Sequence, residues 1–443
     1  MSVTQIFLAS TLYGTATLAA ALDSDAFPPA GRRILLTSNH SVTAEITPGL
    51  TTAPGFAALR TRFDEVLDWN AVIAPQHPST WSPRAEDVPL WERQLRASWG
   101  LGADRVELVV ESLQVPPAQS LCRLFPGAAV DVYADGLMSY GPTRFRLDPA
   151  IGMRVRRVLH LDLVPGLEPL LLTEFGVRAE VIPAAAFVKA VAELEVPEPV
   201  SAGEAPALLL GQYLSALDLV PAREEEELHV EMVRGAHALG HRELVFKPHP
   251  SAPAAYARRA QEEARRLGVR LTVLNTPVLA ETLFERLRPA LVVGCFSTGL
   301  LTAATLYGLP VARTGTQAVL ARLSPYPNSN RIPLAVADAL LPDLADAPAV
   351  RSWAPPGPER VAAELAGLLT AVGFTMQPQI LAARRAEAER WLAGNLTPRT
   401  WRYFTRRRLT ALGLPGGIPA QLSFLPRSRS ARRMARLLRR VVS

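Results

Sequence analysis

The strongest constraint on the fold is an alternation of short apolar strands and helices that runs along most of the chain. In the first half, we expect strands at 5–9, 33–37, 71–74, 106–110, 130–133 and 155–162, and helices at 11–22, 56–67 and 90–99. Short strands that alternate with helices are typical of a parallel sheet with helices on both faces.

The alternation is interrupted once, at 195–206 (EVPEPVSAGEAP), where the lack of an apolar period predicts an interdomain linker. It then restarts, with strands expected at 207–210, 243–246, 271–274, 291–293 and 311–312, and helices at 224–239, 254–267, 278–287 and 298–307. Gly240, Gly268 and Gly308 stand where three of these helices should end. Beyond them, 345–358 is rich in loop residues, and helices are expected at 362–369 and 380–392.

The sequence therefore predicts an α/β protein of two doubly wound, Rossmann-type domains that face a cleft. We expect the first domain at 1–195, the second at 207–375, and a helical return segment with a basic tail at 376–443. A length of 443 residues suits two domains. With 49% hydrophobic and 20% charged residues, extensive disorder is excluded.

Composition also limits the kinds of site and segment that the chain can contain. Two cysteines, Cys122 and Cys295, exclude a disulfide scaffold, and no Cys/His spacing resembles a zinc site, so no metal is expected. The uncharged stretches 1–22 and 289–312 are broken by Ser, Thr, Gly and Pro residues. We therefore predict neither a signal peptide nor a transmembrane helix.

Three polar motifs follow predicted strands, at the edge where parallel sheets bind their ligands. The first is Asp135-Gly136, in which a carboxylate at a strand end can serve as a general base. An Asp-Gly pair is also a common turn, so this motif alone is weak.

The second motif is Lys247-Pro248-His249-Pro250. Two prolines restrict the backbone around one imidazole, and a lysine beside it supplies a positive charge, a combination that suits a phosphate group. The third is Ser297-Thr298, which is expected to cap a helix whose free N–H groups can bind phosphate. A structural loop and an ordinary helix cap are the alternatives for these two motifs.

With these motifs in this order, the chain resembles the bacterial alpha-2,8-polysialyltransferase family, related to other bacterial sialyltransferases of GT-B fold. The resemblance lies in Asp135-Gly136, His249-Pro250 and Ser297-Thr298. It extends to the run at 10–14 and to the segment 134–144 (ADGLMSYGPTR), and it covers about residues 1–375.

The resemblance implies an inverting glycosyltransferase that moves a sialic acid, or a related nonulosonic acid, from a CMP-activated donor to a glycan hydroxyl in cell-surface polysaccharide synthesis. Such an enzyme is expected to need neither a metal nor another cofactor. By analogy, Asp135 deprotonates the acceptor, His249 stabilises or protonates the departing CMP phosphate, and Ser297 and Thr298 hold that phosphate. Related sialyltransferases often carry two acids before the glycine, whereas this chain has Ala134 and then Asp135. The second acid is the one usually assigned as the base.

The remaining candidate residues are as compatible with a structural role as with a functional one. Lys247 is expected at the donor phosphate, Gln212 and Tyr213 at the nucleotide, Arg144 at a sugar carboxylate, and Ser10 and Thr11 on the acceptor side.

Two other function classes stay open. Glycerophosphate transferases that use CDP-glycerol carry a similar Lys-Pro-His-Pro segment, but they usually have an Asp before their Ser pair, where this chain has Gly294-Cys295-Phe296. A non-catalytic protein that binds nucleic acid or glycans through the basic tail is the other class.

The tail carries the excess positive charge. The chain has twelve arginines and no acid from Arg399 onward, against a net charge of +6 for the whole chain. In 430–443 (SARRMARLLRRVVS), Met434, Leu437, Leu438 and Val441 fall on one helical face. We expect a cytoplasmic protein held at the inner face of the cell membrane by this helix on anionic lipid, with no nucleic-acid partner. The nearby aromatics Trp401, Tyr403 and Phe404 are expected on the first domain or at the lipid interface.

Overall fold

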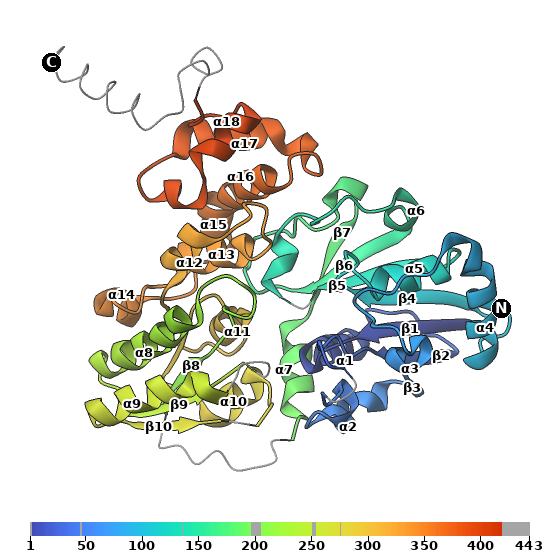
Figure 1. Cartoon of the computed structure of the whole chain (residues 1–443), viewed down its shortest axis with the longest axis horizontal. Helices are drawn as coiled ribbons and strands as arrows, with labels where there is room; N and C mark the ends of the chain where they lie inside the picture. Colours follow the sequence, from blue (N-terminus) through green and yellow to red (C-terminus); the bar gives the residue numbers. More distant parts are fainter. Residues whose placement is uncertain are drawn as a thin grey trace.

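The computed structural model describes residues 2–44, 47–134, 136–195, 205–249, 254–274 and 276–418. Two α/β lobes lie side by side, and a group of helices extends the second lobe (Figure 1). Asp135, Pro250 and the amphipathic stretch at 430–443 lie outside the described residues.

The first lobe is built on a seven-stranded parallel sheet with the order β3-β2-β1-β4-β5-β6-β7. Its strands are β1 (Val3–Ala9), β2 (Arg32–Thr37), β3 (Glu65–Asp68), β4 (Arg105–Glu111), β5 (Ala129–Ala134), β6 (Val155–Leu161) and β7 (Arg178–Ile182). Because the order turns back at β1 and β4, the carboxyl ends of these central strands form the expected ligand edge.

Helices cover both faces of this sheet. They are α1 (Leu12–Asp23), α2 (Phe56–Leu59), α3 (Trp69–Ile73), α4 (Val88–Ser98), α5 (Ala118–Leu124), α6 (Pro149–Gly152) and α7 (Ala184–Ala192). One face packs on α1, α2 and α7, in a hydrophobic core that continues into the second lobe. The other face forms a separate core with α3, α4, α5 and α6.

The second lobe has a five-stranded parallel sheet with the order β10-β9-β8-β11-β12. Its strands are β8 (Ala207–Leu210), β9 (Glu243–Lys247), β10 (Arg270–Val273), β11 (Leu291–Gly294) and β12 (Val311–Arg313). The helices are α8 (Ala222–Ala238), α9 (Arg258–Leu267), α10 (Ala280–Leu287), α11 (Thr298–Leu306), α12 (Thr316–Arg322), α13 (Arg331–Leu340) and α14 (Ala347–Ser352). The three glycines expected to end helices, Gly240, Gly268 and Gly308, all have positive φ angles, which confirms that prediction.

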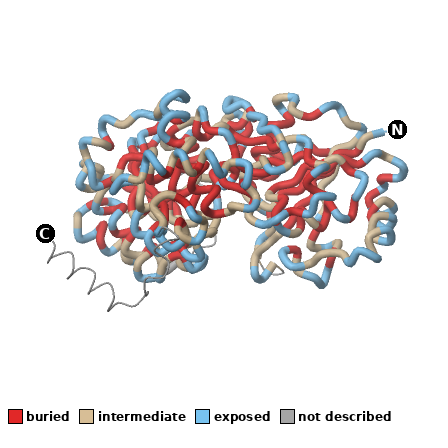
Figure 2. The backbone as a smooth tube through the Cα atoms, turned by 90° about the horizontal axis from the view of Figure 1, so that it is seen from above, coloured by how far each residue is buried: buried red, intermediate tan, exposed pale blue. Residues whose placement is uncertain are grey.

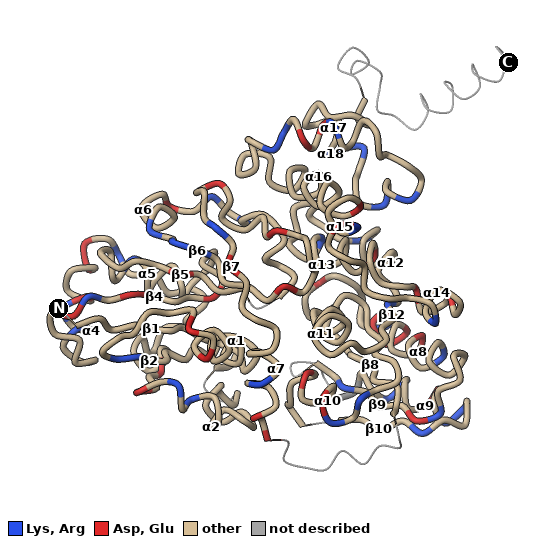
Figure 3. The backbone as a smooth tube through the Cα atoms, turned by 180° about the vertical axis from the view of Figure 1, so that it is seen from behind, with Lys and Arg blue, Asp and Glu red and all other residues tan. Residues whose placement is uncertain are grey.

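The last described part of the chain is α15 (Pro358–Val361), α16 (Gly367–Met376), α17 (Arg385–Asn395) and α18 (Arg406–Leu412). Figure 3 shows Lys and Arg at several points along this part. Its aromatics correct our expectation, because Tyr403 and Phe404 are buried against the second lobe. The Tyr403 hydroxyl donates to the Asp338 carboxylate at 2.8 Å, and Arg402 pairs with the same carboxylate at 3.0 Å.

Four local predictions are wrong. The segment 71–73 lies in helix α3, and the edge strand β3 lies just before that helix and overlaps the end of the helix predicted at 56–67. Strand β7 was not expected, and 345–358 contains helix α14. The two central sheets match the prediction closely, and their buried strands form the red interior of both lobes in Figure 2. This architecture confirms the predicted GT-B-like fold class.

Candidate active site

The histidine motif lies at the carboxyl edge of the second sheet, as predicted. Lys247 is the last residue of β9, and its carbonyl accepts a hydrogen bond from Gly211 at the end of β8, at 2.9 Å. Two residues later, the His249 imidazole stacks on the Tyr213 ring, with ring centroids 4.0 Å apart and 35° between the planes. The structure therefore brings His249 and Tyr213 together.

Gln212 connects the His249–Tyr213 pair to the neighbouring strand β11. Its side-chain oxygen accepts the Phe296 N–H at 3.1 Å, so the ends of β8 and β11 are joined directly. Gly211 allows the close approach, because a Cβ atom there would lie 2.8 Å from the Phe246 ring. His249, Tyr213, Gln212 and the Ser297-Thr298 pair therefore form one continuous row along the edge.

The Ser/Thr motif begins α11. Ser297 is the N-cap, and its hydroxyl accepts the Gly299 N–H at 3.2 Å. Helix α11 has nine residues, and in its first turn the Gly299 and Leu300 N–H groups donate to the Ser297 hydroxyl and carbonyl oxygens, at 3.2 and 3.0 Å. Both Ser297 and Thr298 are partly exposed, so a phosphate group can reach them.

The two lobes meet at this helix start. The Leu137 N–H lies 3.5 Å from the Thr298 hydroxyl oxygen. A Cβ atom on Gly136 would lie 2.9 Å from the same oxygen. Asp135 itself is outside the described residues, but both of its chain neighbours are described, and Gly136 touches the predicted phosphate site.

The candidates on the acceptor side lie in the first lobe. Thr11 caps α1, with its hydroxyl accepting the Gly14 N–H at 2.9 Å, and Ser10 precedes it at the end of β1. Arg144 lies farther along the segment that follows Gly136. Its carbonyl accepts the Gln377 side-chain N–H at 2.6 Å, and its guanidinium lies 2.8 Å from the Met138 sulfur. Arg144 is therefore at the contact between the lobes, beside the last residues of α16.

Burial sets the charge state of the two basic groups in the histidine motif. Desolvation, together with the positive charge of Lys247, lowers the pKa of His249 to about 4. Lys247 is only 8% exposed, and burial lowers its pKa too, although the nearby Glu281 carboxyl opposes that effect. The imidazole is therefore neutral at pH 7.

Our sequence reasoning missed Glu281. It lies in the first turn of α10, is 4% exposed, and accepts a hydrogen bond from the Thr302 hydroxyl of α11 at 2.9 Å. Burial raises the pKa of Glu281, and Lys247 acts in the opposite direction. No sequence pattern marked this residue, because an acid in the first turn of a helix is common.

Our sequence reasoning also missed two carboxylates at the carboxyl edge of the first sheet. Glu111 ends β4, is 9% exposed, and accepts a hydrogen bond from the Tyr133 hydroxyl at 3.1 Å. Asp162 follows β6, and burial raises its pKa. A signal was present for both, since each acid stands at the carboxyl end of an apolar strand.

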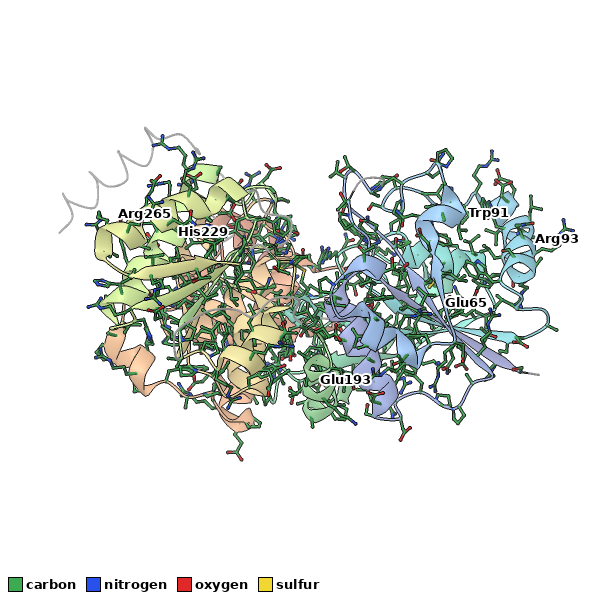
Figure 4. All side chains as sticks on the ribbon, turned by 90° about the horizontal axis from the view of Figure 1, so that it is seen from below. Glu65, Trp91, Arg93, Glu193, His229 and Arg265 are labelled. Carbon is green, nitrogen blue, oxygen red and sulfur yellow. The ribbon has the colours of Figure 1, made fainter. Side chains whose placement is uncertain are left out.

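Other titratable groups lie away from this edge. His229 is buried in the second lobe, with its ring 4.9 Å from the Phe246 ring, and burial lowers its pKa (Figure 4). Within the described ranges, no group of three or more His, Cys, Asp or Glu side chains is arranged to hold a metal ion. No helix in the described part of the chain combines the length and the apolar character that a membrane span needs.

Several solved structures are similar to this chain at low identity. Acinetobacter baumannii MurG is 12% identical, with a TM-score of 0.40, over 88% of this chain and 95% of that one. The alpha/beta-galactoside alpha-2,3-sialyltransferase of Photobacterium phosphoreum is 11% identical, with a TM-score of 0.37, over 68% and 88%. A glycosyltransferase from Rickettsia africae is 10% identical, with a TM-score of 0.39, over 87% and 93%. No curated protein sequence matches the chain significantly.

The sequence profile of one family does match. The profile described as alpha-2,8-polysialyltransferase aligns with residues 5–316, which is more than half of the 443 residues. The match includes all three motifs, from the first lobe through the start of α11. The chain therefore belongs to the alpha-2,8-polysialyltransferase family and is a glycosyltransferase.

Proposed function

We propose that the protein transfers sialic acid, or a related nonulosonic acid, from a CMP-activated donor to a hydroxyl of a glycan acceptor, with inversion at the anomeric carbon. One observation carries this proposal: Gly136, the residue after Asp135, lies against Thr298 at the start of α11. The proposed base is therefore the chain neighbour of a residue that contacts the proposed phosphate site.

In the proposed reaction, Asp135 takes the proton of the acceptor hydroxyl as the oxygen attacks the anomeric carbon. A new carbon–oxygen bond forms to the acceptor, and the bond from the anomeric carbon to the CMP phosphate oxygen breaks, with its electron pair leaving on CMP. Attack opposite the leaving group inverts the configuration. Positioning and charge compensation supply most of the rate enhancement in such a step.

The second lobe would hold the departing phosphate. Ser297 and Thr298 offer hydroxyls and helix N–H groups, and Lys247 supplies positive charge from behind His249. Because His249 is neutral before the donor binds, it would donate a hydrogen bond to the phosphate. Tyr213 and Gln212 would border the nucleotide, Arg144 the sugar carboxylate, and Ser10 and Thr11 the acceptor.

We further propose that the acceptor is part of a cell-surface polysaccharide made at the inner face of the membrane. The seven arginines at 427–440 would hold the enzyme on anionic lipid, at about 1 kcal/mol for each basic residue near the surface. The described helices up to α18 pack on the second lobe, so this attachment would leave both lobes free to bind their substrates.

The central test is the variant Asp135→Ala. We expect the rate of sugar transfer from CMP-sialic acid to an oligosaccharide to fall by about 10²- to 10⁴-fold, the usual contribution of a general base. CMP binding, measured by calorimetry, should stay within about threefold, because the nucleotide site is on the other lobe. Asp148→Ala, at an exposed helix cap of the same lobe, is the control and should transfer normally.

Donor class and metal dependence need separate measurements. A thermal-shift series with CMP, CDP, UMP and UDP should give the largest stabilisation with CMP. Dialysis against EDTA should leave the transfer rate unchanged. Normal turnover in Asp135→Ala would remove the proposed base, and turnover of CDP-glycerol in place of CMP-sialic acid would move the protein to the glycerophosphate transferases.

A further inference from the structure

Glu225 is a buried residue near the start of α8 that binds the loop after β8. It lies in the first turn of the helix, and none of its surface is exposed. Its Oε1 atom accepts the Leu214 N–H at 2.7 Å, and its Oε2 atom accepts the Ser215 N–H at 2.8 Å. The Ser215 hydroxyl also donates to Oε2, at 2.7 Å. One side chain therefore holds two consecutive residues of the loop.

The beginning of the same loop is held at the edge of the sheet. The Gly211 N–H donates to the Lys247 carbonyl at the end of β9, at 2.9 Å. The Gln212 side-chain oxygen accepts the Phe296 N–H from the end of β11, at 3.1 Å. Tyr213 lies between these contacts and the two residues that are bound from α8, so its backbone is held on both sides.

The Tyr213 ring is the part of this loop that reaches the histidine motif. It stacks on the His249 imidazole, with ring centroids 4.0 Å apart and 35° between the planes. At this distance the two rings are in van der Waals contact, so the imidazole can turn toward Tyr213 only if that ring moves. The position of Tyr213 therefore limits the directions in which the imidazole can point.

Tyr256 connects a later part of the histidine segment to the same loop. It lies in the 3₁₀ turn Ala254–Ala257, which follows the motif in the chain, and its hydroxyl oxygen is 2.6 Å from the Ser215 hydroxyl oxygen. Because the Ser215 hydroxyl gives its single proton to Glu225, the Tyr256 hydroxyl is the donor in this pair. The segments that follow β8 and β9 are therefore both hydrogen-bonded, directly or through Ser215, to one side chain of α8.

We propose that Glu225 is a positioning residue for sugar transfer, which holds Tyr213 against His249 and so orients the imidazole toward the departing phosphate. This inference rests on the role proposed for His249. A hydrogen bond weakens steeply when its N–H points away from the acceptor, so the contribution of the imidazole depends on its orientation. A glutamate that only stabilised the start of α8 would leave the imidazole unchanged, and the test therefore measures the imidazole itself.

The variant Glu225→Gln tests the inference, because an amide keeps the size of the side chain but offers one acceptor oxygen to three donors. NMR of histidine-labelled protein at pH 7, assigned with His249→Gln, reports on the stacking through the ring current of Tyr213. We expect the His249 C–H resonances to move toward their positions in Tyr213→Leu, which lacks the ring. The kcat for transfer from CMP-sialic acid should fall by about 10- to 100-fold, with KM for the acceptor within about threefold.

Glu263→Gln is the matched control, because it also removes a buried acid from the second lobe. Glu263 lies on α9, is 8% exposed, and pairs with Arg234 and Arg266, each at 2.6 Å. This variant loses ion pairs and does not alter the loop after β8. It should leave both the His249 resonances and kcat as they are in the wild type.

The proposal is overturned if Glu225→Gln keeps the wild-type His249 resonances or the wild-type kcat. If that variant does not fold, Ser215→Ala is judged by the same two measurements, since it removes the hydroxyl and leaves both backbone N–H groups bound to Glu225. Inactivity of the wild type with CMP-sialic acid would instead remove the proposed function, and the resonances would still show whether Glu225 holds the two rings together.

Discussion

The neutral state of His249 changes the chemistry that its motif suggests. In sequence, Lys-Pro-His-Pro reads as two cations beside a phosphate. In the structure, burial and the Lys247 charge lower the pKa of His249 to about 4, so one cation suppresses the other. A neutral imidazole still donates an N–H hydrogen bond, and in the proposed reaction it would gain a proton only as negative charge accumulates on the departing phosphate.

The effect of the Lys247 charge on the pKa of His249 gives a prediction with a definite sign. In Lys247→Met, the pKa of His249 should rise above 4 but stay below 6.5, because burial, the larger cause, remains. Titration of the imidazole by NMR measures it directly. Lys189→Met is the control, since Lys189 is the other lysine of the chain and is exposed on α7. An unmoved His249 titration would show that the Lys247 charge does not reach the ring.

The residue types at the site could be predicted because polar residues that directly follow an apolar strand are easy to recognise in the sequence. His249 and the Ser297-Thr298 pair both lie at the expected edge. Burial and partners could not be predicted, since they depend on segments far apart in the sequence. Glu111, for example, contacts Tyr133 only because β4 and β5 are neighbours in the sheet.

Among the elements, the contact between the turn after β5 and the start of α11 relates the two halves of the site. A 3₁₀ turn at Leu137–Tyr140 follows Gly136 and packs beside α13, while Leu137 faces Thr298. The backbone of Gly136 is extended, so any residue could adopt it, and the space beside Thr298 is what requires a glycine. The turn after β5 and the start of α11 are therefore held together by direct packing.

The variant Gly136→Ala tests this contact. A methyl group would lie 2.9 Å from the Thr298 hydroxyl oxygen and push the lobes apart there. We expect kcat to fall by about 10- to 100-fold, since a displacement of about 1 Å can cost that much. The double variant Gly136→Ala/Thr298→Ala removes the obstructing oxygen and should recover to the rate of Thr298→Ala alone. A double variant as slow as the product of the two single effects would argue against the contact.

At the level of elements, the central strands were predictable and the edges of the first sheet were not. The buried strands at the centre of both sheets are rich in apolar residues, and all of them were found. At the edge, β3 has only four residues and none is fully buried, so its pattern is weak. The apolar run that follows it belongs to α3, where Trp69 and Ile73 are buried four residues apart, as one helical face requires.

For the whole molecule, the two lobes are joined by more than the linker. Their hydrophobic core is continuous, α7 of the first lobe contacts α10 and α11 of the second, and the Thr305 hydroxyl donates to the Leu163 carbonyl at 2.9 Å. Seen from below, side chains of both lobes meet in the middle of the molecule (Figure 4). The segment after Gly136 is therefore braced by the second lobe at both Thr298 and Gln377.

The C-terminal part of the chain divides into a packed section and the basic stretch beyond it. Arg408 donates to the Thr375 carbonyl at 2.6 Å, and Arg402 pairs with buried Asp338, so these arginines stabilise the second lobe. From the sequence alone, these arginines could not be distinguished from those at 427–440, because composition does not show which side chains are packed. Arg402 and Arg408 are therefore engaged with the packed part of the chain, whereas the arginines at 427–440 lie outside the described residues.

Truncation after Ile418 tests that division of roles. The shortened protein should keep the full transfer rate on a soluble oligosaccharide, because every described site residue and α18 remain. It should lose most of its binding to vesicles that contain anionic phosphatidylserine, measured by co-sedimentation at low and high salt, since seven arginines are removed. Vesicles of neutral phosphatidylcholine are the control. Equal sedimentation of both proteins with anionic vesicles would exclude the tail as the membrane contact, whereas salt-sensitive DNA binding lost on truncation would identify it as a nucleic-acid arm.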